Sequence, residues 1–133
     1  MTSGSIFGHK LETLAAPLAI VRLAAGAGLP WWAAREGDFL SFTRTPDETS
    51  IVCEARHVPE GVEREGPYRA LRLVGVFSLE SAGILAFLAV PLTAARVPIF
   101  VVATHDTDYI LVPADRLALA IGALREAGHS VDE

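Results

Sequence analysis

Residues 83–112 read GILAFLAVPLTAARVPIFVVATHDTDYILV, and this stretch decides the fold. Apolar residues in its first part recur at helical spacing, and Arg96 with Pro98 then ends the predicted helix. Two short strands rich in β-branched residues follow, separated only by the polar segment 104–108. A helix followed directly by two strands fits few folds. Because polar groups gather where these strands end, we expect a small-molecule site there.

The flanking sequence completes a β-α-β-β-α-β order in the second half. A strand over 68–77 comes before the first helix. A second helix starts at 113–115 and is stopped by Gly128. Residues 129–132 add a last edge strand.

The sequence also predicts the positions of several individual side chains. Val76 is expected to face inward with Leu71 and Leu73, and the hydroxyl of Ser78 or Ser81 is placed to cap the first helix. Three histidines have no partner pattern and are expected on the surface: His9, His57 and His129.

The first half is expected to contain strands with degraded helices. Its apolar runs predict strands at residues 18–23, 39–43 and 50–55. Residues 1–16 are expected to be a loose lead-in, and the Pro- and Gly-containing connector 59–67 is the best boundary between halves. We therefore expect two domains, at residues 1–66 and 67–133.

An internal repeat links the two halves. Thr45–Arg56 matches Thr104–Asp115 at a constant offset of 59. Four pairs are identical: Thr45/Thr104, Asp47/Asp106, Ile51/Ile110 and Ala55/Ala114. In each copy a strand enters, a polar corner turns, and an apolar strand returns. The sequence therefore predicts an α+β protein of two modules, whose antiparallel sheets carry helices on one face.

Composition excludes several classes of function. The chain has 133 residues and a net charge of −5, with no basic run, so we expect no nucleic-acid partner. Its one cysteine, Cys53, excludes an internal disulfide and is expected to be a plain buried thiol. Glycine and proline interrupt the apolar stretch 14–34, and 81–95 is too short to span a bilayer. With no signal-peptide pattern, we expect a cytoplasmic protein without a membrane partner.

Five motifs occur in a specific order and spacing: Phe42–Asp47, Ser50–Cys53, Gly83–Ala86, Pro91–Leu92 and Thr104–Val112. Together they resemble the ACT-domain proteins of the CASTOR type, which are small cytosolic amino-acid-sensing or regulatory modules. The resemblance covers Leu18 to Val131. It implies two tandem ferredoxin-like (βαββαβ) ACT domains. It also implies a homodimer, since other members carry two such pairs in one chain.

The resemblance also implies a ligand site. In the sensing members, an amino acid lies at the start of the first helix, the start of the second strand and the corner after it. These positions correspond to Ser81, Gly83, Ile84, Leu85, Pro98, Ile99, Thr104, His105 and Asp108. The strand start of one chain would face the helix start and corner of the other. Ser81 and His105 differ from the residues of an arginine-sensing member, so a smaller or neutral amino acid fits at least as well.

Elementary chemistry supports such a site, although each residue has a simpler explanation. A helix N-terminus suits a carboxylate, and Asp108 or Asp106 suits an ammonium or guanidinium group. Alternatively, Ser81 only caps its helix, Gly83 only permits close packing, and Thr104 with Asp106 only closes the turn. The histidine and two aspartates of segment 104–108 could also mimic a metal site, but three ligands on one short turn rarely converge.

Two functions remain open. The first is a non-catalytic regulatory module that binds an amino acid between ACT domains of a homodimer. The second is a protein–protein interaction adaptor with a vestigial ligand cleft. We expect no catalytic residue, metal or cofactor, because no nucleophile is spaced with a base.

Overall fold

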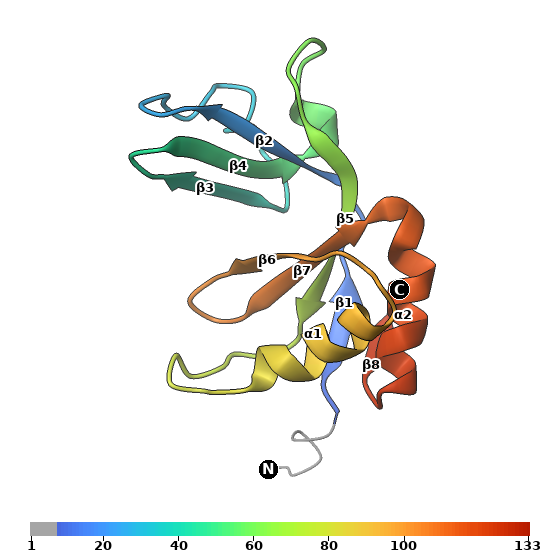
Figure 1. Cartoon of the computed structure of the whole chain (residues 1–133). Coiled ribbons are helices and arrows are strands. Elements are labelled where there is room, and N and C mark those ends of the chain that lie inside the picture. Colours follow the sequence, from blue (N-terminus) through green and yellow to red (C-terminus); the bar gives the residue numbers. More distant parts are fainter. Residues whose placement is uncertain (1–7) are drawn as a thin grey trace. The chain divides into compact units, whose positions relative to one another are not determined.

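The structure, a computed structural model, describes residues 8–133 and divides the chain into two compact units (Figure 1). The first, here called the composite unit, joins the segment up to Ala15 with Arg69–Glu133. The second, the inserted unit, is Ala16–Tyr68. Strand β5 (Glu65–Leu73) belongs to the inserted unit at its start and to the composite unit at its end. The sequence suggested one boundary, after residue 66. The structure has two boundaries, one after Ala15 and one after Tyr68, and the latter lies two residues beyond the expected position.

The residues before Ala15 are not the loose lead-in expected from the sequence. Strand β1 (Lys10–Thr13) lies between β5 and the last strand β8 (Ser130–Asp132), antiparallel to the former and parallel to the latter. Leu11 supplies the physical reason. It pairs with Leu73 on β5 and with Val131 on β8, and all three side chains are buried in one hydrophobic core.

The composite unit is a sheet covered by two helices. Its other elements are α1 (Ile84–Ala94), β6 (Phe100–Ala103), β7 (Asp108–Pro113) and α2 (Leu117–Glu126). The strand order is β6-β7-β5-β1-β8. From β5 onward the order is β-α-β-β-α-β, which confirms the α+β prediction. Both helices pack into the core that contains Leu11, on one face of the sheet (Figure 1).

Helix α1 contains a proline, Pro91, that leaves one carbonyl of the helix without its usual donor. Pro91 has no N–H to donate to the carbonyl of Phe87, one turn earlier. The ring of His129 lies there instead, with Nε2 2.9 Å from that carbonyl oxygen. Its Nδ1 accepts the backbone N–H of His9 at 3.0 Å. Because Nδ1 accepts, the proton must be on Nε2, so this one imidazole, just before β8, joins α1 to the residue before β1.

The prediction of surface histidines is therefore wrong. His129 is 5% exposed and His57 is 6% exposed, and the rings of His9 and His129 stack at 5.9 Å. Burial, followed by the neighbouring His129, lowers the pKa of His9. Sequence offered no partner for the ring of His129 because its acceptor and donor are backbone groups.

Both helices end as the sequence indicates. Arg96 adopts φ +61° after α1, and Val97 donates its N–H to the carbonyl of Leu92 at 2.9 Å. Gly128 adopts φ +99° after α2, and His129 bonds back to Leu124 at 3.0 Å in the same way. These are two Schellman ends, and the second confirms the predicted stop at Gly128. None of the helices in the described part of the chain is long and apolar enough to cross a membrane.

Two details of the segment between β5 and α1 differ from expectation. Val76 is 77% exposed, whereas Leu71 and Leu73 are buried, because β5 ends at Leu73. No serine caps α1: its N-cap is Gly83, and the hydroxyl of Ser78 accepts from the N–H of Glu80 at 3.1 Å. That hydroxyl closes a local turn instead.

The inserted unit is a small antiparallel sheet. Its strands are β2 (Leu18–Ala24), β3 (Leu40–Arg44) and β4 (Glu48–Glu54), in the order β3-β4-β2, with the start of β5 next to β2. The part of this unit that the structure describes contains no α-helix, only a 3-10 turn at Ala55–His57. Cys53 lies in its core as predicted, and burial raises the pKa of the thiol.

The internal repeat is confirmed at the level of local structure. In the first copy, β3 and β4 form a hairpin that runs into the 3-10 turn Ala55–His57. In the second, β6 and β7 form a hairpin that runs into the 3-10 turn Ala114–Arg116. The two turns lie at the offset of 59 that the sequence shows.

Candidate functional site

A cavity of about 230 Å³ opens in the composite unit. One wall is the segment between β5 and α1, with the first residues of α1. The other is the second corner, which we define as residues 104–108, the connection from β6 into β7. The lining residues are Leu73, Phe77, Ser78, Leu79, Ser81, Gly83, Ile84, Leu85, Ala103, Thr104, His105, Asp106, Thr107 and Asp108.

Side-chain to backbone bonds hold the second corner in shape. The hydroxyl and the backbone N–H of Thr104 both donate to the carbonyl of Thr107, at 3.0 and 2.8 Å. The hydroxyl of Thr107 is buried and donates to the carbonyl of Leu73 at 2.6 Å. This last bond fixes the corner to the end of β5. Thr104 therefore closes the turn, as the simpler explanation required.

A further bond brings the opposite wall against the corner. The backbone N–H of Phe77 donates to the carbonyl of Asp106 at 2.8 Å. Together with the bond from Thr107 to Leu73, it attaches the second corner both to the opposite wall and to the end of β5. The cavity is thus bounded by segments that the backbone itself holds in place.

The start of α1 lines this cavity with Gly83, Ile84 and Leu85. Gly83 has φ +84°, and an added Cβ would meet no atom within 4 Å. The glycine is thus explained by its left-handed backbone, not by close packing. No side chain caps the helix, and its first turn holds no acidic residue. The N–H groups at Ile84 and Leu85 keep the partial positive charge of an uncapped helix start.

Asp108 is the less exposed of the two carboxylates that line the cavity. It is half-buried at the start of β7, and its carboxylate has no hydrogen bond or ion pair with any described residue. Asp106 differs, because its side chain is 60% exposed and lies 3.0 Å from Nδ1 of His105. No lysine or arginine is among the described residues that line the cavity. A ligand would meet N–H donors on one wall and a carboxylate acceptor on the other.

The structure brings together seven of the nine residues named from the sequence: Ser81, Gly83, Ile84, Leu85, Thr104, His105 and Asp108. Pro98 and Ile99 lie before β6 and do not line this cavity. The sequence did not indicate Leu73, Phe77 and Leu79, because this part was predicted to be the end of a strand and the approach to a helix. Asp106, which the sequence analysis gave as an alternative to Asp108, also lines the cavity. Thr107 could have been found, since it belongs to the same polar corner.

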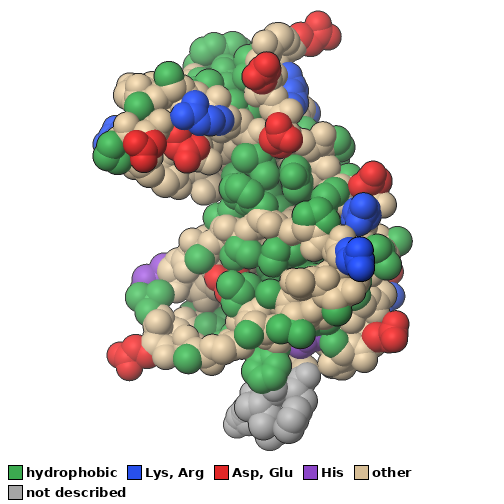
Figure 2. Space-filling view, viewed as in Figure 1, with side chains coloured by type: hydrophobic (Ala, Val, Ile, Leu, Met, Phe, Trp, Pro, Cys, Tyr) green, Lys and Arg blue, Asp and Glu red, His purple; other side chains and the backbone are tan. Residues whose placement is uncertain are grey.

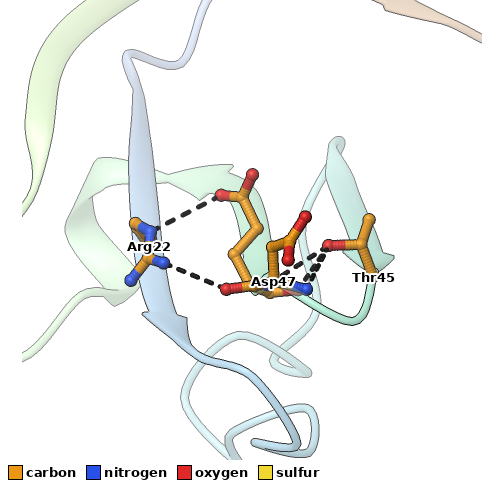
Figure 3. A network of polar contacts seen from close by, with 4 residues as sticks. Arg22, Thr45 and Asp47 are labelled. Carbon is orange, nitrogen blue, oxygen red and sulfur yellow. Dashed lines mark hydrogen bonds and ion pairs between the residues drawn. The ribbon is translucent and has the colours of Figure 1, made fainter.

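The first corner, residues 45–49, has the same turn but is closed by the protein itself (Figure 3). Thr45 bonds to Glu48 as Thr104 bonds to Thr107. The guanidinium of Arg22, on β2, donates to the carbonyl of Asp47 at 3.1 Å and lies 3.9 Å from the carboxylate of Glu48. An internal cation thus occupies the acceptors of the first copy.

Titratable groups elsewhere have structural roles. Glu54 is buried in the inserted unit, where it accepts the N–H of Asp38 at 2.6 Å and pairs with Arg56 at 2.8 Å. The bond from Asp38 is the main reason that the pKa of Glu54 is lowered. Among residues 8–133, no group of three His, Cys, Asp or Glu is arranged to hold a metal ion.

Family comparison covers both halves of the chain. Residues 63–126 match the ACT domain, and residues 17–61 match a family described only as an N-terminal domain. The crystal structure of protein Atu0741 from Agrobacterium tumefaciens shares 37% identity, over 93% of this chain and 92% of that one, with a TM-score of 0.85. No protein with a curated description matches.

More distant structures share the fold. Protein VC0802 from Vibrio cholerae, of unknown function and described as a possible transport protein, has 22% identity and a TM-score of 0.75, covering 92% of this chain and 91% of that one. The regulatory subunit of aspartate kinase from Thermus flavus has 13% identity and a TM-score of 0.60, covering 88% and 95%.

Proposed function

Since this chain belongs to the same family as Atu0741 and carries an ACT domain, we propose that it is a non-catalytic regulatory module of the cytoplasm that binds an amino acid. The observation that carries the proposal is the pairing of opposite polar groups across the cavity. Uncapped N–H groups begin α1 on one wall, and the unpartnered carboxylate of Asp108 lies on the other. The shared fold with a regulatory subunit of aspartate kinase agrees with a regulatory role.

Recognition follows from the charges of an amino acid. Its α-carboxylate accepts hydrogen bonds from the N–H groups at the start of α1, where the helix dipole favours an anion. Its α-ammonium donates to Asp108, and such a charge-assisted bond contributes about 1.5–3 kcal/mol. Ser81, Thr104 and His105 complete the polar lining.

We expect Asp108→Asn to abolish most of the amino-acid response while leaving the fold intact. The substitution keeps the shape of the side chain and removes its charge, so affinity should fall at least about tenfold. Differential scanning calorimetry of the full chain with each of the twenty amino acids measures this. A binder present at a hundred times its Kd stabilises the wild type by about 2.7 kcal/mol.

Asp115→Asn is the matched control, because Asp115 is exposed on the 3-10 turn and does not line the cavity. It should respond like the wild type. An Asp108→Asn variant that still gains full stability from the same amino acid would remove Asp108 from the site.

The proposal extends to assembly. We interpret the inserted unit as a second, degenerate ACT-like module, because its hairpin and 3-10 turn repeat those of the composite unit. The two modules of one chain pair with those of a second, so that Pro98 and Ile99 of one protomer face the cavity of its partner. Light scattering should then give twice the chain mass of 14.2 kDa. A monomer at micromolar concentration would contradict this arrangement.

One observation favours the adaptor as a second candidate. Among residues 8–133, five of the nine exposed large hydrophobic side chains lie within residues 76–90: Val76, Leu79, Leu85, Phe87 and Val90. Hydrophobic side chains lie over α1 on the face drawn in Figure 2. Such a concentration is typical of a protein-binding surface. Calorimetry separates the candidates, since an adaptor with a vestigial cleft responds to none of the twenty amino acids.

A further inference from the structure

We infer that the cavity selects an amino acid with an uncharged, apolar side chain. The inference rests on the proposed function, because it takes the α-ammonium and α-carboxylate to be bound as described there. What remains of the lining then decides which side chain is accepted.

The charged residues of the lining leave no good partner for a charged side chain of the ligand. Asp108 receives the α-ammonium, which leaves Asp106 as the other carboxylate of the lining. Asp106 is 60% exposed and already lies 3.0 Å from Nδ1 of His105, so water screens it from a ligand. A cationic side chain therefore finds no second half-buried carboxylate. An anionic side chain finds only His105, which is 83% exposed and already lies beside Asp106, because no lysine or arginine is among the described lining residues.

The apolar part of the lining is left to contact the side chain. It consists of Leu73, Phe77, Leu79, Ile84, Leu85 and Ala103. Leu73 is buried, whereas Leu79 is 73% exposed and Leu85 is 36% exposed. An apolar side chain would remove part of this surface from water, and a charged one would lose hydration in exchange for apolar contact.

The size of the cavity limits the ligand. A volume of 230 Å³ corresponds to about seven or eight waters of the bulk liquid. Pockets for drug-sized molecules begin at about 300 Å³. A single amino acid with a side chain of medium length matches this space.

Norleucine and lysine form the matched pair for the test, because lysine is norleucine with a terminal ammonium added. Isothermal titration calorimetry with the full chain should show norleucine binding about tenfold or more tightly than lysine, alanine or glutamate. Alanine tests how much the length of the apolar side chain contributes to affinity, and glutamate tests whether a negatively charged side chain is accepted.

Substitutions of Leu79 test whether the apolar lining causes the preference for norleucine. Leu79→Ser should weaken norleucine binding about fivefold, since part of the apolar contact is lost. Because Leu79 is exposed, the unfolding temperature without ligand should stay near that of the wild type. Val76→Ser is the control: Val76 is 77% exposed in the same segment but does not line the cavity. Leu79→Asp should reverse the order of norleucine and lysine.

The outcomes are distinct. Norleucine binding most tightly, with a loss in Leu79→Ser but not in Val76→Ser, supports the inference. Lysine or glutamate binding as tightly as norleucine overturns it and leaves amino-acid binding in place. Binding of no amino acid overturns the inference together with the proposed function.

Discussion

Replacing Leu11 by alanine is expected to reduce the free energy of unfolding by about 3–4 kcal/mol, the cost of a fully buried leucine with a cavity left behind. Leu11 is fully buried, and its neighbours across the strands are Leu73 and Val131. The result would show that β1 is part of the core of the composite unit. Urea unfolding followed by circular dichroism gives the measurement.

Lys10→Ala is the control on the same strand. The ammonium of Lys10 is exposed and pairs with Asp132 at 3.3 Å, so its loss should cost less than about 1 kcal/mol. If both variants unfold at the same urea concentration as the wild type, β1 does not contribute to this core. The two results would then contradict the sheet order β5-β1-β8.

Strand β1 also shows where the sequence was insufficient. It has only four residues, KLET, and a single buried apolar position, so no alternation could be recognised. What makes it a strand is pairing with β5 and β8, which are distant in sequence. The hairpins were predictable because they are local: each has two apolar strands joined by a corner that begins with threonine. The repeat then reinforced each prediction with the other.

The polar residues of the candidate site were predictable from the sequence, but its apolar residues were not. The polar residues Thr104, His105 and Asp108 were visible because they interrupt an apolar run. The apolar wall was not visible, because Phe77 and Leu79 look like ordinary residues between a strand and a helix. Their place in the lining depends on the bond from Phe77 to Asp106, which joins segments almost thirty residues apart.

The burial of His129 was also missed, because its hydrogen-bond partners are backbone groups distant in sequence. A substitution of His129 tests the importance of these bonds. His129→Phe is expected to cost about 3 kcal/mol, because two backbone groups lose their partner at once. The carbonyl of Phe87 loses the donor on Nε2, and the N–H of His9 loses the acceptor on Nδ1. Phenylalanine keeps an aromatic ring beside His9, so the change isolates the hydrogen bonds. His105→Phe, at a histidine whose side chain is 83% exposed, should change stability little.

A double-mutant cycle with Pro91→Ala shows whether the proline creates the need for the histidine. Alanine at this position restores the N–H that donates to the carbonyl of Phe87 within α1. His129→Phe should then leave only the N–H of His9 without a partner, and its cost should fall by about 1–2 kcal/mol. An equal cost in both backgrounds would mean that the imidazole does not compensate for Pro91. A smaller cost in the alanine background would show that a break in one helix is repaired by a residue about forty positions later, immediately before β8.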